Sequence, residues 1–320
     1  MNSKIHSPPF SGLATFAKFP ILSSDNFKNS KNSFGIIGIP YDMGVTNIPG
    51  TRLGPREIRL ASTQYAYTSS QNYLGMADSK RGFFDINQNK WLLKNNPCFD
   101  LGDVEVIAGD PESTFKLITE SIEKILDSKI CPIILGGDHA ITYPILKSYK
   151  NYEDITILHF DAHMDYWNPE NNSIYDHSCS MWNVSRLPNI AHIYQFGIRG
   201  LNHRSSMLTD AKKHNITTIT SKELDIDLIN TINKVKLTNN IYISFDIDFF
   251  DPSIAPGTGN REQGGFNYVQ TNNLLKALLN NKKSTLIGLD LVEINPLNDV
   301  GHLTSSLGAR LVLDLIGLFN

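Results

Sequence analysis

The sequence has few cysteines, no long apolar run and no excess of charge of either sign. Its three cysteines, Cys98, Cys131 and Cys179, are an odd and scattered set, which excludes a disulfide framework and favours a reducing, cytoplasmic location. No uninterrupted apolar stretch reaches the roughly 20 residues that span a bilayer, and residues 1–10 lack the pattern of a secretory signal. A formal net charge of -3 gives no support for nucleic acid or an anionic membrane as a partner.

What the chain does have is an alternation of short apolar runs with longer stretches of helical period. Apolar strands separated by helices are typical of a parallel sheet covered on both faces, so the predicted fold class is α/β and doubly wound. No repeat or linker divides the 320 residues, and a single domain is expected, with residues 1–33 packed on it as an arm. The predicted strands are residues 34–39, 98–101, 132–135, 155–160, 190–196, 217–219, 241–245 and 285–290. The predicted helices are residues 55–62, 111–128, 140–149, 203–214, 221–235, 268–280 and 302–318.

Acidic and histidine side chains collect where three of these strands end. In an extended segment the alternate side chains project to the same side, so residues 161, 163 and 165 can converge on one point. Residues 246 and 248 repeat this spacing, and residue 139 follows a third strand. The six side chains are His139, Asp161, His163, Asp165, Asp246 and Asp248. Because ligands of open parallel sheets bind beyond the carboxyl ends of the strands, all six are expected at one crevice, where a cation would neutralise them.

This set of side chains favours a pair of divalent ions. Six ligands exceed the needs of one tetrahedral zinc, and a structural zinc would favour cysteine. Carboxylates with one imidazole per ion suit Mn²⁺ first, with Ni²⁺ or Co²⁺ as alternatives. Two ions about 3.5–4 Å apart can share a water and make hydroxide available near neutral pH, which indicates hydrolysis at carbon or phosphorus. The alternative is that each aspartate caps a helix or turn and each histidine is a satisfied core residue.

The motifs at residues 136–139, 161–165 and 244–252 resemble the three signatures of the ureohydrolases, the arginase and agmatinase family. The resemblance covers almost the whole chain and implies the three-layer α/β/α arginase-type fold with a mostly parallel sheet. It also implies one metal held by His139, Asp161, Asp165 and Asp246. The other metal would be held by His163, Asp161, Asp246 and Asp248, so that Asp161 and Asp246 bridge the two ions.

The same resemblance implies a reaction and roles for three residues. A hydroxide bridging two Mn²⁺ ions would attack the central carbon of a guanidino compound and release urea and an amine. Asp165 would take up the proton of this hydroxide and pass it to the departing amine. Glu293 matches the family carboxylate that pairs with the guanidinium group. His177 matches a histidine thought to shuttle protons and contact substrate, but Ser178 stands where many relatives have glycine, so a plain loop histidine is the alternative.

The substrate is less clearly indicated than the reaction. Residues 255–259 resemble the agmatinase side of the family, so agmatine, cleaved to putrescine and urea, is expected first. Guanidinobutyrate, guanidinopropionate or guanidine are alternatives, as is a non-catalytic regulatory member of the family. Arg261 could attract a substrate carboxylate at the pocket mouth or be a solvated loop residue, and Trp167 and Trp182 could narrow the pocket or lie in the core. The resemblance also implies a homo-oligomer, a trimer or hexamer.

The remaining histidines are expected to lie outside the site. His159 precedes the ligand run within its strand and is predicted to be buried and hydrogen-bonded rather than metal-bound. The others are predicted to be surface or packing residues: His6, His192, His203, His214 and His302.

Overall fold

The computed structural model of this chain describes residues 8–66, 82–93, 97–169, 173–279 and 284–319. At its centre lies an eight-stranded sheet in the order β4-β1-β5-β10-β9-β6-β7-β8, and every neighbouring pair in it is parallel. All eight predicted strands are therefore confirmed. They are β1 (Phe34–Gly38), β4 (Cys98–Asp103), β5 (Cys131–Leu135), β6 (Ile155–Phe160), β7 (Ile190–Ile198), β8 (Ile216–Thr220), β9 (Asn240–Asp246) and β10 (Thr285–Val292).

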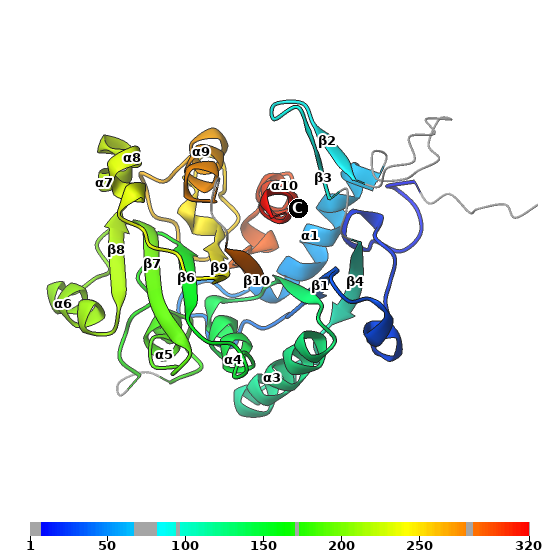
Figure 1. Cartoon of the computed structure of the whole chain (residues 1–320), viewed down its shortest axis with the longest axis horizontal. Coiled ribbons are helices and arrows are strands. Elements are labelled where there is room, and N and C mark those ends of the chain that lie inside the picture. Colours follow the sequence, from blue (N-terminus) through cyan, green and yellow to red (C-terminus); the bar gives the residue numbers. More distant parts are fainter. Residues whose placement is uncertain (1–7, 67–81, 94–96, 170–172, 280–283, 320) are drawn as a thin grey trace, which may run out of the picture.

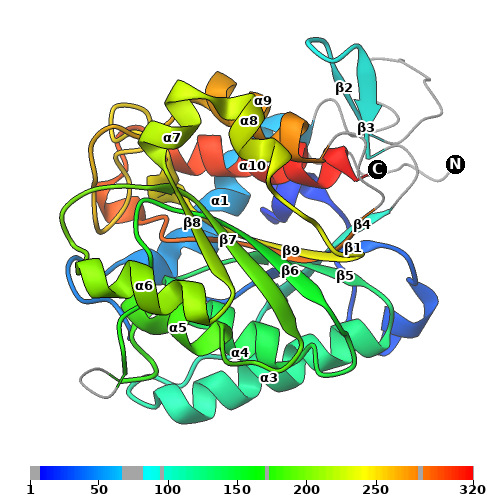
Figure 2. The ribbon, with the colours of Figure 1, turned by 60° about the vertical axis from the view of Figure 1, so that its left-hand side comes forward.

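Helices cover both faces of the sheet, so the α/β class and the three layers are confirmed (Figures 1 and 2). One face carries α3 (Pro111–Asp127), α4 (Thr142–Lys147), α5 (Ser180–Val184) and α6 (Ser205–Lys213). The other carries α1 (Gly54–Ser62), α7 (Ser221–Ile226), α8 (Leu228–Asn233), α9 (Tyr268–Leu279) and α10 (Leu303–Leu318). None of the helices in the described residues combines the length and the hydropathy that crossing a membrane requires.

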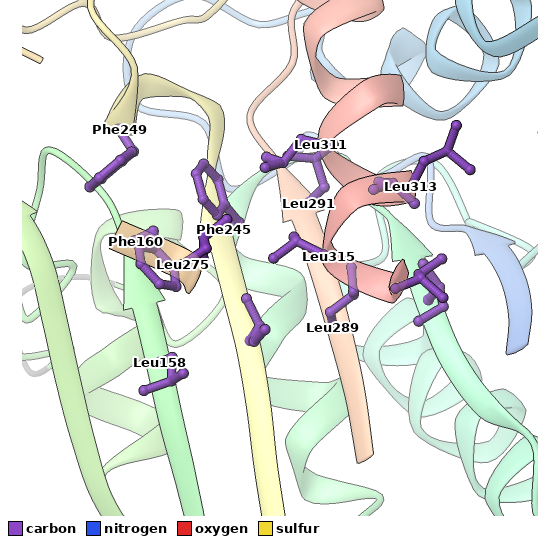
Figure 3. Close-up of a cluster of buried hydrophobic side chains, with 14 of the residues drawn as sticks. Leu158, Phe160, Phe245, Phe249, Leu275, Leu289, Leu291, Leu311, Leu313 and Leu315 are labelled. Carbon is purple, nitrogen blue, oxygen red and sulfur yellow. The ribbon is translucent and has the colours of Figure 1, made fainter. Parts of the chain in front are cut away.

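The strands feed side chains alternately into two hydrophobic cores. Phe245 of β9 packs on the side of α9 and α10, whereas Tyr242 packs on the side of α3 and α4. Figure 3 shows the first core, in which Leu289 and Leu291 of β10 lie close to Leu315 of α10. Because the central strands are covered on both faces, they should be apolar throughout, and any polar side chain within them needs a specific partner.

Some elements differ from the prediction. The predicted helix at 221–235 is divided into α7 and α8 at Asp227, whose extended backbone and side chain cap α8 by accepting a hydrogen bond from Asn230 N at 3.1 Å. The predicted helix at 203–214 begins only at Ser205, so His203 stays in the loop after β7. The hairpin of β2 (Phe83–Asp85) and β3 (Lys90–Leu92) and the helix α5 were not predicted, because such short elements show no clear periodicity.

The strand order gathers distant parts of the chain at the middle of the sheet. From β5 the chain passes to β6 and proceeds outward through β7 and β8. Only then do β9 and β10 fill the space between β6 and β5. The carboxyl ends of β5, β10, β9 and β6 are therefore neighbours, at the kind of topological switch point where α/β proteins bind ligands.

Gly137 allows the chain to turn out of β5 toward His139. A Cβ atom at this position would lie 1.7 Å from the carbonyl oxygen of Tyr41, a backbone atom that cannot swing aside. We expect Gly137→Ala to lower the free energy of unfolding in urea by about 1–3 kcal/mol, the usual cost of overpacking.

Gly35→Ala in β1 is the matched control for this substitution. Its added Cβ would meet side-chain atoms of Leu101 and Ile130, which can adjust their rotamers. The control should therefore lose less stability than Gly137→Ala. Equal losses would show that the approach of Tyr41 does not restrict residue 137.

Candidate metal centre

The ring of His139 is surrounded by carboxylates. His139 follows β5 in a 3-10 turn that Asp138 caps, with Oδ1 accepting a hydrogen bond from Ala140 N at 3.0 Å. The ring is completely buried, and its Nδ1 atom makes no hydrogen bond within the described residues. Three carboxylate oxygens nevertheless surround Nδ1: Asp161 Oδ2 at 3.2 Å, Asp165 Oδ2 at 3.0 Å and Asp246 Oδ2 at 3.2 Å. Ligand atoms of an octahedral divalent ion lie about 3 Å apart, so this arrangement fits a metal.

A second group lies beside the first. His163 Nδ1 is 2.9 Å from Asp248 Oδ2 and 3.6 Å from Asp161 Oδ1. Asp161 thus presents one oxygen to each histidine, as expected of a carboxylate shared between two ions. Asp246 faces His139 with Oδ2, while its Oδ1 accepts a hydrogen bond from Asp248 N at 2.8 Å. All six predicted ligands therefore converge, whereas the bridging role of Asp246 stays a prediction.

The electrostatics of these groups favour a bound cation. Burial, followed by the charges of Asp248 and Asp161, raises the pKa of Asp246 well above its ordinary value. Burial also opposes the charge of Asp161, but the nearby His159 and His139 hold its pKa well below the usual range. Four carboxylates thus share a largely buried space with His139 and His163, and divalent ions would balance the excess negative charge.

Two residues of this site have a backbone conformation that is rare for non-glycine residues. Asp165 has φ 46° and Glu293 has φ 65°, both in the left-handed region. Glu293 N donates a hydrogen bond to Gly137 O at 2.9 Å, which ties the end of β10 to the turn after β5. A conformation that costs about 1–3 kcal/mol persists only where the surroundings impose it, and it often marks a functional site.

Glu293 and His177 form a pair above the carboxylates. Glu293 Oε1 accepts hydrogen bonds from His139 N at 2.9 Å and from His177 Nδ1 at 2.8 Å. Burial lowers the pKa of His177, but Glu293 and more distant carboxylates outweigh this effect and raise the pKa to about 10. The other ring nitrogen, Nε2, lies 2.8 Å from Thr46 Oγ1. Both nitrogens of His177 are therefore engaged, and the ring orients Glu293.

His159 is buried and hydrogen-bonded, as predicted. Its Nε2 lies 2.8 Å from Asp161 Oδ2, and its Nδ1 lies 3.1 Å from Gln195 Nε2. Gln195 Nε2 also donates to Met164 O at 2.6 Å, which fixes the amide orientation and leaves His159 Nδ1 as an acceptor. His159 can then donate its Nε2 proton to Asp161 and hold that carboxylate in place.

A pocket of about 320 Å³ opens over the site. His139 and Asp161 lie beneath it, with no exposed surface. The predicted residues that line it are His163, Asp165, Trp167, His177, Asp246, Asp248 and Glu293. The residues that sequence reasoning missed, or did not place here, are Thr46, Met164, Ser178, Asn202, His203, Thr258 and Asn260.

At the rim of this pocket the structure bears on two alternatives that the sequence left open and corrects one prediction. Arg261 is exposed, its Nε donates to Pro256 O at 2.7 Å, and it is not among the described residues that line the pocket. Trp182 lines a neighbouring groove, where the guanidinium carbon of Arg186 lies 3.3 Å from its ring centroid. His203 was predicted to lie outside the site, which is wrong, because α6 begins after it and leaves it at the pocket.

Comparisons with known proteins agree with this geometry. The model of the arginase family matches residues 32–317. This chain belongs to the arginase family. An agmatinase from Blochmanniella floridana is 33% identical over 290 residues, which cover 89% of this chain and 88% of that protein. An agmatinase from Photorhabdus laumondii is 31% identical over 310 residues, 95% of this chain and 92% of that protein.

A solved structure shows the same fold. The proclavaminate amidino hydrolase from Streptomyces clavuligerus superposes with a TM-score of 0.84 at 25% identity, covering 98% of this chain and 99% of that one. The chain is therefore a hydrolase of the arginase family, most similar to agmatinases, with a His/Asp cluster able to bind metal.

The binding of metal should be visible in the stability of the protein. We expect Mn²⁺, added to the metal-stripped protein at 100 times its dissociation constant, to raise the free energy of unfolding by about 2.7 kcal/mol. His139→Asn should reduce this gain, because it removes a central ligand. His192→Asn is the control, since His192 lies near the amino end of β7 with Nε2 2.8 Å from Thr217 Oγ1. Equal responses of both variants in thermal denaturation would exclude His139 as a ligand.

Proposed function

We propose that this chain hydrolyses agmatine to putrescine and urea at a two-metal centre. The observation that carries the proposal is the position of Glu293, whose carboxylate lies in the same pocket as the His/Asp cluster. A carboxylate matches the planar, forked donors of a guanidinium group, so it can hold the substrate carbon close to the cluster.

The residues present suit two divalent ions, Mn²⁺ first. One ion would be held by His139, Asp161, Asp165 and Asp246, and the other by His163, Asp161, Asp246 and Asp248. When bound, two such ions lower the pKa of a shared water and so supply a nucleophile near neutral pH.

Glu293 would bind and orient the guanidinium group. Its Oε1 is already occupied by His139 N and His177 Nδ1, whereas Oε2 accepts no hydrogen bond from the described residues. Oε2 is therefore the atom available to the substrate. Glu293 raises the pKa of His177 to about 10, and the Nδ1 proton of His177 holds the Glu293 carboxylate in place.

Asp165 is suited to moving a proton. It lines the pocket, and its Oδ2 belongs to the group around His139 Nδ1. Its second oxygen, Oδ1, could accept a proton from the attacking water and return it to the departing amine, which must be protonated to leave. The backbone of Asp165 is held by Met181 N, which donates to its carbonyl oxygen at 2.9 Å.

The side chains that line the pocket bear on the charge of the substrate tail. Among the described residues that line it, none is lysine or arginine, and Asn202 and Asn260 offer neutral amides. Arg261, the residue that would have attracted a carboxylate, bonds elsewhere. An ammonium tail such as that of agmatine therefore suits this pocket better than the carboxylate of guanidinobutyrate or guanidinopropionate. The agmatinases among the relatives support the same choice.

A substrate panel tests the proposal. We expect the Mn²⁺-loaded protein to release urea from agmatine with a kcat/KM at least about tenfold above that for guanidinobutyrate, guanidinopropionate or guanidine, a difference of roughly 1.4 kcal/mol. A parallel series with Ni²⁺ identifies the productive metal. Urea release from a guanidino acid alone would contradict the substrate, and no release despite two bound ions would favour a regulatory family member.

Glu293→Gln isolates the binding of the guanidinium group. The variant keeps the shape of the side chain but loses the charge, and one partner of a buried charge pair is usually worth about 2–5 kcal/mol. We therefore expect kcat/KM for agmatine to fall by about 30-fold to 5,000-fold. Metal content should stay at the wild-type level, because Glu293 is not a proposed ligand.

Glu153→Gln serves as the control for this loss of charge. Glu153 is exposed, and its carbonyl oxygen accepts a hydrogen bond from Asn240 Nδ2 at the amino end of the sheet, away from the pocket. Its variant should retain wild-type kinetics. A Glu293→Gln enzyme that loses its metals, or that remains fully active, would overturn the role given to Glu293.

A further inference from the structure

A row of polar side chains crosses the sheet directly beneath the candidate metal centre. Asp290 of β10 is in register with Ser244 of β9, Ser244 with His159 of β6, and His159 with Gln195 of β7. All four are completely buried. Strands covered on both faces normally carry apolar side chains, so a polar row at one level of the sheet requires an explanation. His159 bonds Asp161, and Gln195 bonds His159, so these two polar side chains support a candidate ligand. The presence of Asp290 and Ser244 in the row is not explained by these contacts.

Asp290 is a buried carboxylate whose hydrogen bonds come from hydroxyl groups. Its Oδ1 accepts a hydrogen bond from Ser244 Oγ at 2.8 Å, and its Oδ2 accepts from Tyr242 Oη at 2.6 Å and Thr142 Oγ1 at 3.1 Å. Within the described residues it has no ion pair with lysine or arginine. Burying an unpaired carboxylate is costly, and an apolar side chain here would stabilise the sheet better. The charge is therefore kept for a purpose other than stability.

The direction of these hydrogen bonds points to that purpose. A serine hydroxyl has one proton, and Ser244 gives it to Asp290 Oδ1. The lone pairs of Ser244 are then left for His139, whose Nε2 lies 2.9 Å away and must act as the donor. With the proton held on Nε2, the lone pair of Nδ1 is directed at the three carboxylate oxygens, where an ion would sit.

We propose that Asp290, acting through Ser244, is a positioning residue for His139 and tunes the affinity of one of the two metal ions. The inference rests on the proposed two-metal centre. The negative charge of Asp290 polarises Ser244 and thereby the Nε2–H bond of His139, which makes Nδ1 a stronger ligand. Ser244 accepts a hydrogen bond from the ring of His139. The ring of His163, the histidine proposed for the other ion, has no hydrogen bond to Ser244 or Asp290 within the described residues. The effect is therefore selective for one ion.

The test is a Mn²⁺ titration of the metal-stripped protein by calorimetry, with electron paramagnetic resonance to distinguish single ions from coupled pairs. Ser244→Ala removes the acceptor of the Nε2 proton, and Asp290→Asn removes the charge. We expect each to weaken one ion by about 10–100-fold, the usual effect of losing a partner of a ligand, and to leave the other ion unchanged. Ser244→Thr restores a hydroxyl and should recover much of the lost affinity.

Tyr242→Phe is the matched control. It removes a hydroxyl that bonds the other oxygen of Asp290, within the same buried network but away from His139. It should lower the free energy of unfolding of the metal-free protein while both ions bind as in wild type. Equal weakening of both ions in Ser244→Ala, or no weakening of either, overturns the inference. If the wild-type protein binds no Mn²⁺ at all, the proposed function fails instead, so the two failures can be told apart.

Discussion

The structure depends on the confinement of several carboxylates in one largely buried place. Asp161, Asp165 and Asp246 each direct an oxygen at the same nitrogen of His139, within 3.2 Å. Like charges this close repel one another and lose hydration, so they stay together only if the rest of the fold holds them there. Two extensive hydrophobic cores, one on each face of the sheet, provide that stability. Asp165 and Glu293, both at this site, have the left-handed backbone that non-glycine residues rarely adopt.

Because of the order of the strands, the site can form only after the central strands have paired. Its groups come from β5, β6, β9 and the end of β10, which are neighbours in the sheet but are spread along more than half of the chain. The pairing of β9 with β6 and of β10 with β5 closes the sheet, and until both form, His139 has no carboxylate of β9 beside it. Non-local pairings of this kind form slowly because long loops must close first. The repelling charges are thus brought together by the contacts that complete the core.

The place of the site at the strand ends was predictable from the sequence, whereas contacts between distant loops made its rim unpredictable. Asp161, His163 and Asp165 come directly after β6, so their position at the carboxyl end of a central strand followed from the sequence. The extended spacing expected for them is wrong, because the chain bends after β6 and Asp165 has φ 46°. Arg261, whose Nε donates to Pro256 O, is not among the described residues that line the pocket, and no pattern in the chain reveals this. The positioning pair Asp290 and Ser244 could be noticed in the sequence only as polar residues in apolar strands. Their partnership comes from the register between β9 and β10.

The candidate metal ligands and the other pocket residues lie on different kinds of element, which bears on the choice of substrate. The candidate metal ligands lie at or just after the ends of the central strands, while Thr46, Asn202 and Asn260, which line the pocket, lie in connecting loops. Loops can change without disturbing the sheet, and the proclavaminate amidino hydrolase, with a TM-score of 0.84, shares the fold under a different substrate name. The fold therefore supports the hydrolytic chemistry of the family but does not determine which substrate is bound. That selection falls to the side chains that line the pocket, and none of those described is lysine or arginine.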